Sequence, residues 1–419
     1  MDLAEEKMNY SQVLEWIYSA LPMFQKSGAS AYKPGLDSTF RLMDYLGNPE
    51  KGLVCIHVAG TNGKGSVSNM LASILMESGY RTGLYTSPHL LDFRERIRVD
   101  GRMIPQQRVA DFTNTHLDYF KANSLSFFEM STGMAFDYFR SENVDVAVIE
   151  TGLGGRLDST NVVTPLLSII TNIALDHTAI LGPTRPLIAS EKSGIIKPGV
   201  PVLVGECDEE IEPVLRARAD SLNAPFHISR PVTGYRDYGC PLGGDYQRFN
   251  ISTVINACSL LVGALPGIND SSISSGLRNV VKNTEFHGRW QVLGEKPLVV
   301  CDTGHNVNGV SEVMRQLVAL PVKKLHIVFG MVDDKDADGV LSLLPPDARY
   351  YFVQASVRRA LDSRILMEKA GRFSLRGEAF PDCVSGFRAA LNAAGDDDCV
   401  FVGGSTFVVA DILSDVMKG

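Results

Sequence analysis

The sequence lacks the features that mark several classes of protein. No two of its seven cysteines have C-x-x-C spacing, which argues against a zinc site or a disulfide framework and fits a reducing compartment. There is no run of basic residues, and the formal charge is −8. Nucleic acid and anionic membranes are therefore not expected as partners. We find no internal repeat, low-complexity tract or linker rich in proline and serine.

Long apolar runs are also missing. The most apolar long stretch, VVTPLLSIITNIAL, is interrupted by Pro165, Thr171 and Asn172, so no segment is expected to span a membrane. The N-terminal MDLAEEKMNY is acidic and polar, unlike a secretory signal. These two absences predict a cytoplasmic protein.

The composition is that of a globular protein with a substantial core. Hydrophobic residues make up 45% and charged residues 21% of the sequence. A length of 419 residues is enough for two or three domains. Apolar runs typical of buried strands alternate with an amphipathic helical pattern at 67–78 and a helical stretch around 309–319. This alternation predicts an α/β fold with parallel sheets covered on both faces. Strands are expected at 53–58, 81–86, 144–150, 166–173 and 200–205, and again at 297–302, 324–330, 349–355 and 398–404.

Two domains follow from this pattern. Helical patterning stops near RWQVLGEKP, residues 289–297. We therefore expect an N-terminal P-loop-type domain with a mainly parallel sheet at 1–289. A smaller C-terminal α/β domain of Rossmann-like type is expected at 290–419.

The segment HVAGTNGKGS, residues 57–66, resembles a phosphate-binding loop with altered positions. The pattern G-x-x-x-x-G-K-[ST] would place glycine where Val58 stands and a hydroxyl where Gly65 stands. A buried strand ends at Val58, and a helix is expected to begin near Ser66. This arrangement directs backbone N–H groups at an anion, with Lys64 as a point charge. The alternative is an ordinary glycine-rich turn.

Further polar side chains follow other predicted strands. Glu150 ends the strand at 144–150 and precedes a glycine-rich turn, so it is a candidate metal ligand; the alternative is a strand-end cap. Asp176 and His177 follow the strand at 166–173 and should emerge at the same edge of the sheet. Imidazole is an unusual ligand for magnesium, which gives the carboxylate more weight. Lys192 lies on a short helical segment near this edge, where a surface ion pair is the alternative.

The predicted domain boundary carries a third group. Arg289 in HGRW could reach a phosphate, and Asp302 and His305 begin the first strand-to-helix loop of the second domain. Together with the loop at 57–66, they suggest a nucleotide held between two domains.

Five motifs in combination identify a family resemblance. HVAGTNGKGS, TSPHLLDFRERI, ETGLGGRLDSTN, LDHTAILG and EKSGIIKPG resemble the folylpolyglutamate synthase and dihydrofolate synthase family, which belongs to the Mur ligase superfamily. With further matches up to about residue 407, the resemblance covers most of the chain. Gly65-Ser66 is the folate branch's variant of the loop, whereas Mur enzymes place Thr or Ser directly after the lysine.

The resemblance implies a role for each matching residue. It implies catalytic roles for Lys64, Lys192 and His305, with Lys192 carbamylated. The implied metal ligands are Ser87, Glu150, His177 and the carbamylated Lys192. The implied ATP-binding set is Gly60, Thr61, Asn62, Gly63, Lys64, Gly65, Ser66, Asn256, Arg289, Asp302 and His305. The implied folate- and glutamate-binding set is Arg96, Phe128, Asp158 and Ser405, where Phe128 stacks on the pterin and Asp158 contacts it.

The resemblance also implies the reaction. A monomeric ligase would use ATP and two Mg²⁺ ions to add L-glutamate to dihydropteroate, to reduced folate (poly)glutamates, or to both, through an acyl phosphate. Phe128 and Asp158 favour a bifunctional enzyme. The alternatives are a Mur-type ligase for UDP-sugar peptides, a glutamate-independent P-loop kinase or NTPase, and a nucleotide switch without catalysis.

Overall fold

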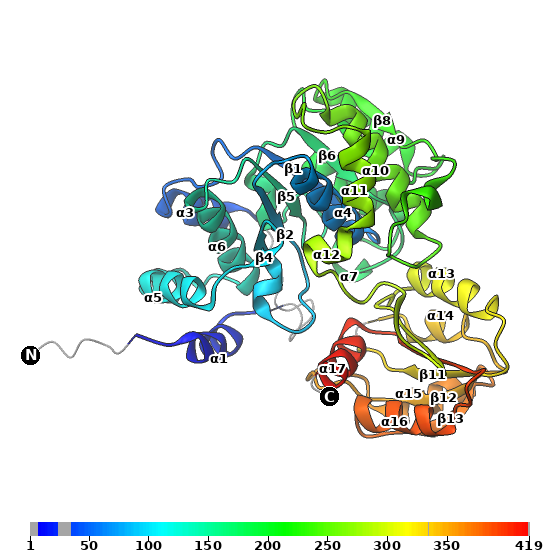
Figure 1. Ribbon diagram of the computed structural model, residues 1–419. Helices are drawn as coiled ribbons and strands as arrows, with labels where there is room; N and C mark the ends of the chain where they lie inside the picture. Colours follow the sequence, from blue (N-terminus) through cyan, green and yellow to red (C-terminus); the bar gives the residue numbers. More distant parts are fainter. Residues whose placement is uncertain (1–6, 24–34, 334, 418–419) are drawn as a thin grey trace, which may run out of the picture. The chain divides into compact units, whose positions relative to one another are not determined.

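The computed structural model describes residues 7–23, 35–333 and 335–417. Its contacts divide the chain into two compact units, each described by itself below (Figure 1). The first unit comprises Met1–Ile173, Thr178–Gly239 and Phe249–Glu285. The second comprises Ala174–His177, Cys240–Arg248 and Phe286–Gly419. The short segment Ala174–His177 therefore contacts the second unit, although the chain on either side of it belongs to the first.

An eight-stranded sheet forms the centre of the first unit, in the order β4-β3-β2-β5-β1-β6-β7-β8. All pairs from β2 to β8 are parallel, and only the edge pairs β2–β3 and β3–β4 are antiparallel. The continuous apolar strands are buried on both faces, as expected for parallel sheets. The strands are β1 Cys55–Ala59, β2 Thr82–Tyr85, β3 Ile97–Val99, β4 Arg102–Met103, β5 Val146–Glu150, β6 Leu167–Ile170, β7 Val202–Val204 and β8 Phe226–Ile228.

Helices cover both faces of this sheet and bury apolar side chains against it. One core joins α1, α3, α5 and α6 to β2 and β5, and another joins α8 and α9 to β6 and β7. The helices are α1 Tyr10–Ala20, α3 Asp37–Tyr45, α4 Lys64–Glu77, α5 Gln106–Asn123, α6 Phe127–Ser141, α7 Thr178–Leu181, α8 Arg185–Lys192, α9 Glu212–Ser221, α10 Gln247–Leu261, α11 Asp270–Arg278 and α12 Val280–Thr284. Short 3₁₀ turns lie at Phe93–Arg96, Ser159–Val162, Ser193–Ile195 and Tyr235–Tyr238.

Helix α4 is buried almost all round, from Ser66 to Leu75. It packs against α11 at unusually close range, because a Cβ added at Gly276 would lie 2.5 Å from the Cα of Ile74. The hydroxyl of Ser73 donates to the Gly276 carbonyl at 2.6 Å. The helix that follows the glycine-rich loop is thus fixed by the sheet on one side and by α11 on the other.

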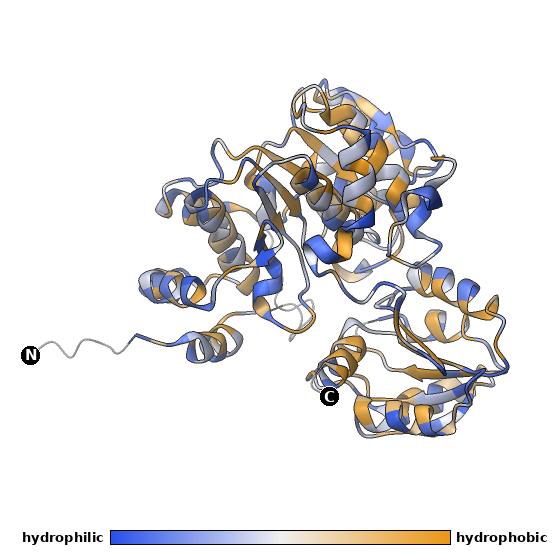
Figure 2. Cartoon of the chain, in the orientation of Figure 1, coloured by the Kyte–Doolittle hydropathy of each residue, from blue (hydrophilic) through white to orange (hydrophobic). Residues whose placement is uncertain are grey.

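The second unit has a six-stranded sheet in the order β13-β12-β11-β14-β10-β9, in which only β9 is antiparallel. Its core includes residues of α13, α14 and α15 packed on strands β10, β11, β12 and β14. The helices of the protein carry both hydrophilic and hydrophobic residues (Figure 2). The strands are β9 Gln291–Glu295, β10 Leu298–Cys301, β11 Leu325–Phe329, β12 Arg349–Phe352, β13 Arg376–Ala379 and β14 Cys399–Gly403. The helices are α13 Val307–Val318, α14 Ala337–Leu341, α15 Ser363–Gly371, α16 Cys383–Ala393 and α17 Thr406–Val416.

The predicted fold class is confirmed: the protein is α/β with two mainly parallel sheets. Each strand expected from an apolar run is present, while β3, β4, β8, β9 and β13 were not anticipated. Helix α4 begins at Lys64, two residues before the predicted start. The domain boundary at 289/290 stays a prediction. Among the described residues, no helix combines the length and apolar character that a membrane crossing requires.

Candidate functional site

The glycine-rich loop connects β1, near the centre of the large sheet, to α4. Gly63 is the N-cap of α4 and has φ +83°, a left-handed conformation that suits glycine. Gly60 has φ +150°, and a Cβ there would lie 1.8 Å from Thr171 Oγ1. The loop backbone therefore requires glycine at both positions, and it leads directly into the N-terminus of a helix, where anions bind.

The loop is held by the residues that follow β6. Asn172 accepts two loop N–H groups: its carbonyl accepts from Thr61 N at 2.9 Å, and its Oδ1 accepts from Asn62 N at 2.8 Å. The Thr171 hydroxyl donates to the Asn62 carbonyl at 2.6 Å. Thr171 and Asn172 were not among the predicted site residues. Their only sequence signal is a polar pair directly after an apolar strand.

Two predicted lysines meet at one carbonyl of this loop. Lys64 Nζ donates to the carbonyls of Gly60 at 3.0 Å and Thr61 at 3.2 Å. Lys192 ends α8, is buried, and donates from Nζ to the same Gly60 carbonyl at 2.8 Å. Residues 128 positions apart in sequence thus place positive charge around the loop, which suits a polyphosphate.

Oxygen donors lie at the same edge of the sheet. Glu150 ends β5, pairs in register with Val58 of β1, and is buried. Its Oε2 lies 3.3 Å from the backbone nitrogen of Ser87, so these two predicted metal ligands are neighbours. A carboxylate and a hydroxyl are donors that Mg²⁺ accepts. Within the described ranges, no group of three or more His, Cys, Asp or Glu side chains is arranged around a metal position; the predicted set relies on serine and a modified lysine as well.

Phe128 and Asp158 lie on either side of the loop that follows Glu150. Phe128, on α6, has its ring 5.9 Å from that of Tyr85, and a Cβ at Gly152 would lie 2.5 Å from its Cζ. The Asp158 carboxylate accepts from the backbone N–H groups of Gly152 at 2.9 Å and Leu153 at 2.8 Å. Burial raises the pKa of Asp158, against the effect of these hydrogen bonds.

Arg96 and Asn256 are tied to nearby groups in the first unit. Arg96 is buried, lies 4.9 Å above the Phe127 ring and donates from Nε to His89 Nδ1 at 2.8 Å. Burial lowers the pKa of its guanidinium. The Asn256 side chain donates to the Arg230 carbonyl at 2.9 Å and fixes the loop before α10. The recorded hydrogen bonds of Asn256 are local, whereas Arg96 lies close enough to Glu150 for the charge of that carboxylate to act on its guanidinium.

In the second unit, the residues after β10 form a local network. Asp302 is buried and accepts from Tyr246 OH at 2.5 Å, Trp290 N at 2.8 Å and Gly304 N at 2.7 Å. His305 Nδ1 lies 3.0 Å from the Thr303 carbonyl, so Nδ1 carries the proton there. These hydrogen bonds hold Asp302 in place. Because Nδ1 of His305 is bonded to the Thr303 carbonyl, its Nε2 atom is left to contact another residue.

The Nε2 atom of His305 lies near Asp176, whose carboxylate also contacts Lys335 and the backbone of His177. Asp176 Oδ2 lies 3.5 Å from His305 Nε2, and its Oδ1 lies 2.5 Å from Lys335 Nζ and accepts from the His177 backbone N–H at 2.8 Å. Burial alone would raise the pKa of Asp176, but the His305 hydrogen bond and the charges of His177, His305 and Lys335 hold it well below its usual range. Lys335 was missed by sequence reasoning, because nothing local links it to a residue 159 positions away.

Two further predicted residues have local structural partners. The Arg289 guanidinium lies 5.3 Å from the Phe286 ring and donates to the Gly288 carbonyl at 3.1 Å. Ser405 caps α17 by accepting from Phe407 N at 3.2 Å.

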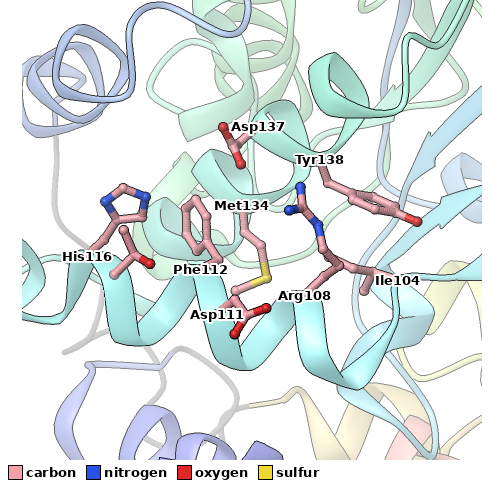
Figure 3. A pocket seen from close by; sticks show the side chains of 9 residues that line it. Ile104, Arg108, Asp111, Phe112, His116, Met134, Asp137 and Tyr138 are labelled. Atoms are coloured by element: carbon pink, nitrogen blue, oxygen red, sulfur yellow. The ribbon is translucent and has the colours of Figure 1, made fainter. Parts of the chain in front are cut away.

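A separate pocket of about 190 Å³ lies between α5 and α6, lined by residues outside every predicted set. Figure 3 shows Arg108 and Tyr138 at one end, His116 at the other, and Phe112 and Met134 between them. Its charged groups already have protein partners, so we assign it no ligand. The pairs are Arg108 with Ser141, Asp111 with Gln107, His116 with Tyr45 and Asp137 with Arg140.

Comparisons with known proteins identify the family of the chain. The family profile described as "Mur ligase, glutamate ligase domain" matches residues 288–406. The dihydrofolate synthase/folylpolyglutamate synthase of Bacillus subtilis is 34% identical and covers 96% of this chain and 98% of its own length. A probable bifunctional folylpolyglutamate synthase/dihydropteroate synthase of Haloferax volcanii is 35% identical over 96% of this chain, which spans only 50% of that relative.

Solved structures extend the likeness to three dimensions. The Escherichia coli FolC complex with DHPP and ADP has a TM-score of 0.86 and 29% identity, covering 98% of both chains. The Yersinia pestis folylpolyglutamate synthase/dihydrofolate synthase, complexed with AMPPNP and Mn ion, has a TM-score of 0.83 and 28% identity, again over 98% of both chains. This chain therefore belongs to the folylpolyglutamate synthase and dihydrofolate synthase family of ATP-dependent ligases.

Proposed function

We propose that this protein is an ATP-dependent ligase that adds L-glutamate to dihydropteroate and to reduced folate (poly)glutamates, releasing ADP and phosphate. The observation that carries the proposal is the loop Gly60–Gly63, on whose Gly60 carbonyl Lys64 and Lys192 converge beside Glu150 and Ser87. Family membership supplies the substrate class: the relatives named above are folate synthases, and one is solved with DHPP and ADP.

The loop is suited to ATP and the strand ends to a divalent cation. Backbone N–H groups at the start of α4 and the ammonium of Lys64 would hold the β- and γ-phosphates. Glu150 and Ser87 fit Mg²⁺ because a buried carboxylate and a hydroxyl at one sheet edge are hard oxygen donors. Bound magnesium would neutralise charge on the phosphate oxygens. A second ion held by carbamylated Lys192, with His177 as a further ligand, belongs to the same proposal.

The proposed reaction has two steps. A carboxylate oxygen of the pterin-bearing substrate attacks the γ-phosphorus and ADP leaves, which gives an acyl phosphate. Lys64 and the loop N–H groups stabilise the charge that develops on the transferred phosphoryl group. The amino group of L-glutamate then attacks the acyl carbon, loses a proton, and phosphate leaves to form the amide. Water must be excluded while the acyl phosphate exists, since it hydrolyses readily.

The remaining predicted residues have roles that rest on the family resemblance. Asn256, Arg289, Asp302 and His305 are proposed to contact ATP. Arg96 and Ser405 are proposed to bind the carboxylates of the incoming glutamate, for which a guanidinium and a hydroxyl are suitable partners.

Mass spectrometry of the products tests the proposal. Purified enzyme is incubated with magnesium-ATP and L-glutamate, and either 7,8-dihydropteroate or a reduced folate monoglutamate. A gain of glutamate on both substrates is expected, and a gain on one alone would restrict the enzyme to that reaction. If neither gains glutamate while ATP is bound, the folate assignment fails. UDP-sugar peptides then become the substrates to test, and glutamate-independent ATP turnover would indicate a kinase or NTPase.

The variant Lys64→Ala tests the role of the loop, and Lys51→Ala is its control. Removing an ammonium that bonds the loop and faces the phosphates should reduce product formation by at least about a hundredfold, as expected for loss of a charge-stabilising group. Lys51→Ala removes an exposed lysine of the same unit and should leave turnover unchanged. Full activity of Lys64→Ala would contradict the assigned role of the loop.

We further propose a cytoplasmic monomer that has no nucleic-acid or membrane partner. Light scattering coupled to size-exclusion chromatography measures the oligomeric state of the purified protein directly. A mass of 45.7 kDa is expected, and twice that value would indicate a dimer.

A further inference from the structure

The segment Ala174–His177 is tied to the second unit by one carboxylate. Lys335 Nζ lies 2.5 Å from Asp176 Oδ1, and the side-chain amide of Asn306 donates to Asp176 Oδ2 at 3.0 Å. The side chains of Asp176 and Lys335 are only 9% and 10% exposed. The chain before and after this segment belongs to the first unit. A nearly buried ion pair therefore holds a short piece of chain that enters the second unit and leaves it again.

The same carboxylate fixes the backbone of His177. Asp176 Oδ1 accepts from the His177 N–H at 2.8 Å, and His177 has φ +50°. A left-handed backbone is uncommon in residues other than glycine, and it persists where the surrounding groups hold it. The carboxylate that Lys335 holds thus also holds the backbone of a residue proposed to bind the metal.

The other oxygen of Asp176 faces a residue with a different proposed role. Oδ2 lies 3.5 Å from Nε2 of His305, which is proposed to contact ATP. The next residue, Asn306, caps α13 through its Oδ1, which accepts from Gly309 N at 2.8 Å, while its amide donates to Asp176. One carboxylate therefore joins the segment that carries His177 to the loop that carries His305.

The surroundings of Asp176 are unfavourable for binding a metal ion directly. A carboxylate has about four lone-pair sites. Lys335 Nζ, the His177 N–H and the Asn306 amide already donate to this one. A metal ion at Asp176 would displace one of these groups and would face the ammonium of Lys335. Of the two strand-end candidates, Asp176 is therefore suited to orient its neighbours, and His177 is left as the ligand.

We propose that Asp176 and Lys335 are positioning residues that couple metal binding to nucleotide binding, because they hold His177 and His305 to one carboxylate. This inference rests on the proposed function, since it concerns the metal and the nucleotide of the same reaction. Loss of the ion pair should release both histidines together. The affinity for metal should fall, and so should the effect of metal on nucleotide affinity.

Manganese binding separates this positioning role from direct ligation by Asp176. Lys335→Met removes the ammonium and keeps a side chain of similar length. If Asp176 were a ligand, loss of a competing cation would strengthen Mn²⁺ binding. If it positions His177, the Kd for Mn²⁺ should rise about ten- to a hundredfold, as expected when a partner of a metal ligand is lost. Electron paramagnetic resonance of the free ion measures this Kd.

Three further variants complete this measurement. Lys324→Met removes an exposed lysine just before β11 and should leave the Kd for Mn²⁺ unchanged. Lys335→Arg keeps the charge and should recover most of the affinity. Lys335→Gln is neutral but can still donate a hydrogen bond, so it should give an intermediate Kd, and it serves in place of Lys335→Met if that variant does not fold.

Titration of ADP by calorimetry, with Mn²⁺ and with EDTA, measures the coupling. The direct bond between metal and ADP is the same in every variant, so a change in the ratio of the two Kd values reports on the protein. The ratio should fall at least about tenfold in Lys335→Met and in Asp176→Asn. It should fall no further in the double variant, since both substitutions break one link. Additive effects would show that Lys335 touches the nucleotide itself, which would overturn the positioning role.

Amide exchange at His177, without metal or nucleotide, tests the local link alone. It should accelerate in Lys335→Met and in Asp176→Asn, because the acceptor of this N–H is freed or weakened. If the wild type shows the coupling but adds glutamate to no pterin substrate, the inference stands and the proposed function fails. Unchanged or tighter Mn²⁺ binding by Lys335→Met would overturn the inference, as would a wild type whose Kd for ADP does not respond to Mn²⁺.

Discussion

Replacing His57 should remove a defined part of the pH dependence of stability in the first unit. Burial, together with the nearby charge of Lys197, lowers the pKa of His57 from 6.5 to about 3. Between pH 3 and pH 6.5, the His57 imidazole is protonated in the unfolded chain but neutral in the folded protein. The stabilising contribution is therefore complete above pH 6.5 and is lost as the pH falls towards 3.

The magnitude follows from these two values. Between pH 7 and pH 5, protonation of the unfolded state alone should cost the folded protein about 2 kcal/mol through this residue. The figure depends little on the folded-state pKa, since pH 5 lies well above it. A folded-state pKa of about 4 would change the expected loss by only roughly 0.1 kcal/mol.

Urea unfolding at pH 7, 6 and 5 measures this contribution. The chain has two tryptophans, so a Trp290→Phe background leaves Trp16, which packs near Phe120, to report on the first unit. The difference in unfolding free energy between the parent and His57→Gln should shrink by about 2 kcal/mol from pH 7 to pH 5. His227→Gln, in the edge strand β8, controls for loss of an imidazole. A difference that stays constant with pH would refute a neutral, buried His57.

Three other substitutions follow from the same structure. Gly63→Ala adds a side chain at positive φ and 2.3 Å from an amide of α10, so calorimetry should show ADP affinity at least about tenfold weaker; Gly199→Ala, at positive φ in open space, is the control. Gly276→Ala should lower unfolding free energy by roughly 1–3 kcal/mol through overpacking against α4, unlike Gly263→Ala. Lys192→Arg should abolish a carbamate signal in ¹³C NMR after bicarbonate labelling; no such signal in the wild type would contradict carbamylation.

The sequence predicts strands correctly where both faces of the strand are buried. Strands β1 and β5 are continuous apolar runs whose side chains all lie inside. Strand β13, Arg376–Ala379, is an exposed edge strand of Arg, Gly, Glu and Ala, and it is held by backbone pairing with β12. Side-chain patterns carry no information about such a strand. Helix α4 departs from the amphipathic helix expected at 67–78, because it is buried on nearly all sides from Ser66 to Leu75. Its start at Lys64 was missed because the glycines at 63 and 65 are poor helix formers.

The candidate site was readable only in its local parts. The loop at 60–66 and the strand-end Glu150 are marked by glycine spacing and by position after an apolar run. The links between distant residues are not marked: Thr160 lies 103 positions from His57, and Lys335 lies 159 from Asp176. Such pairs come together because of the order of strands in the sheet and because the segment Ala174–His177 packs in the second unit. No local sequence pattern predicts the strand order or this packing.

The charges around the loop offer a reason why it departs from the common phosphate-binding pattern G-x-x-x-x-G-K-[ST]. The nitrogens of Lys64 and Lys192 lie 3.0 and 2.8 Å from one oxygen, so they are at most 5.8 Å apart. At that separation two ammonium charges repel by about 3 kcal/mol at an effective dielectric of 20, and they repel more strongly at a shorter one. A polyphosphate or a carbamate on Lys192 would relieve that repulsion, so the site favours negative charge. In the proposed site, the oxygen donors for a cation come separately, from Glu150 at the end of β5 and from Ser87 in the loop after β2. In this proposal, the charges and the donors come from four segments of the chain, and no hydroxyl is needed at Gly65.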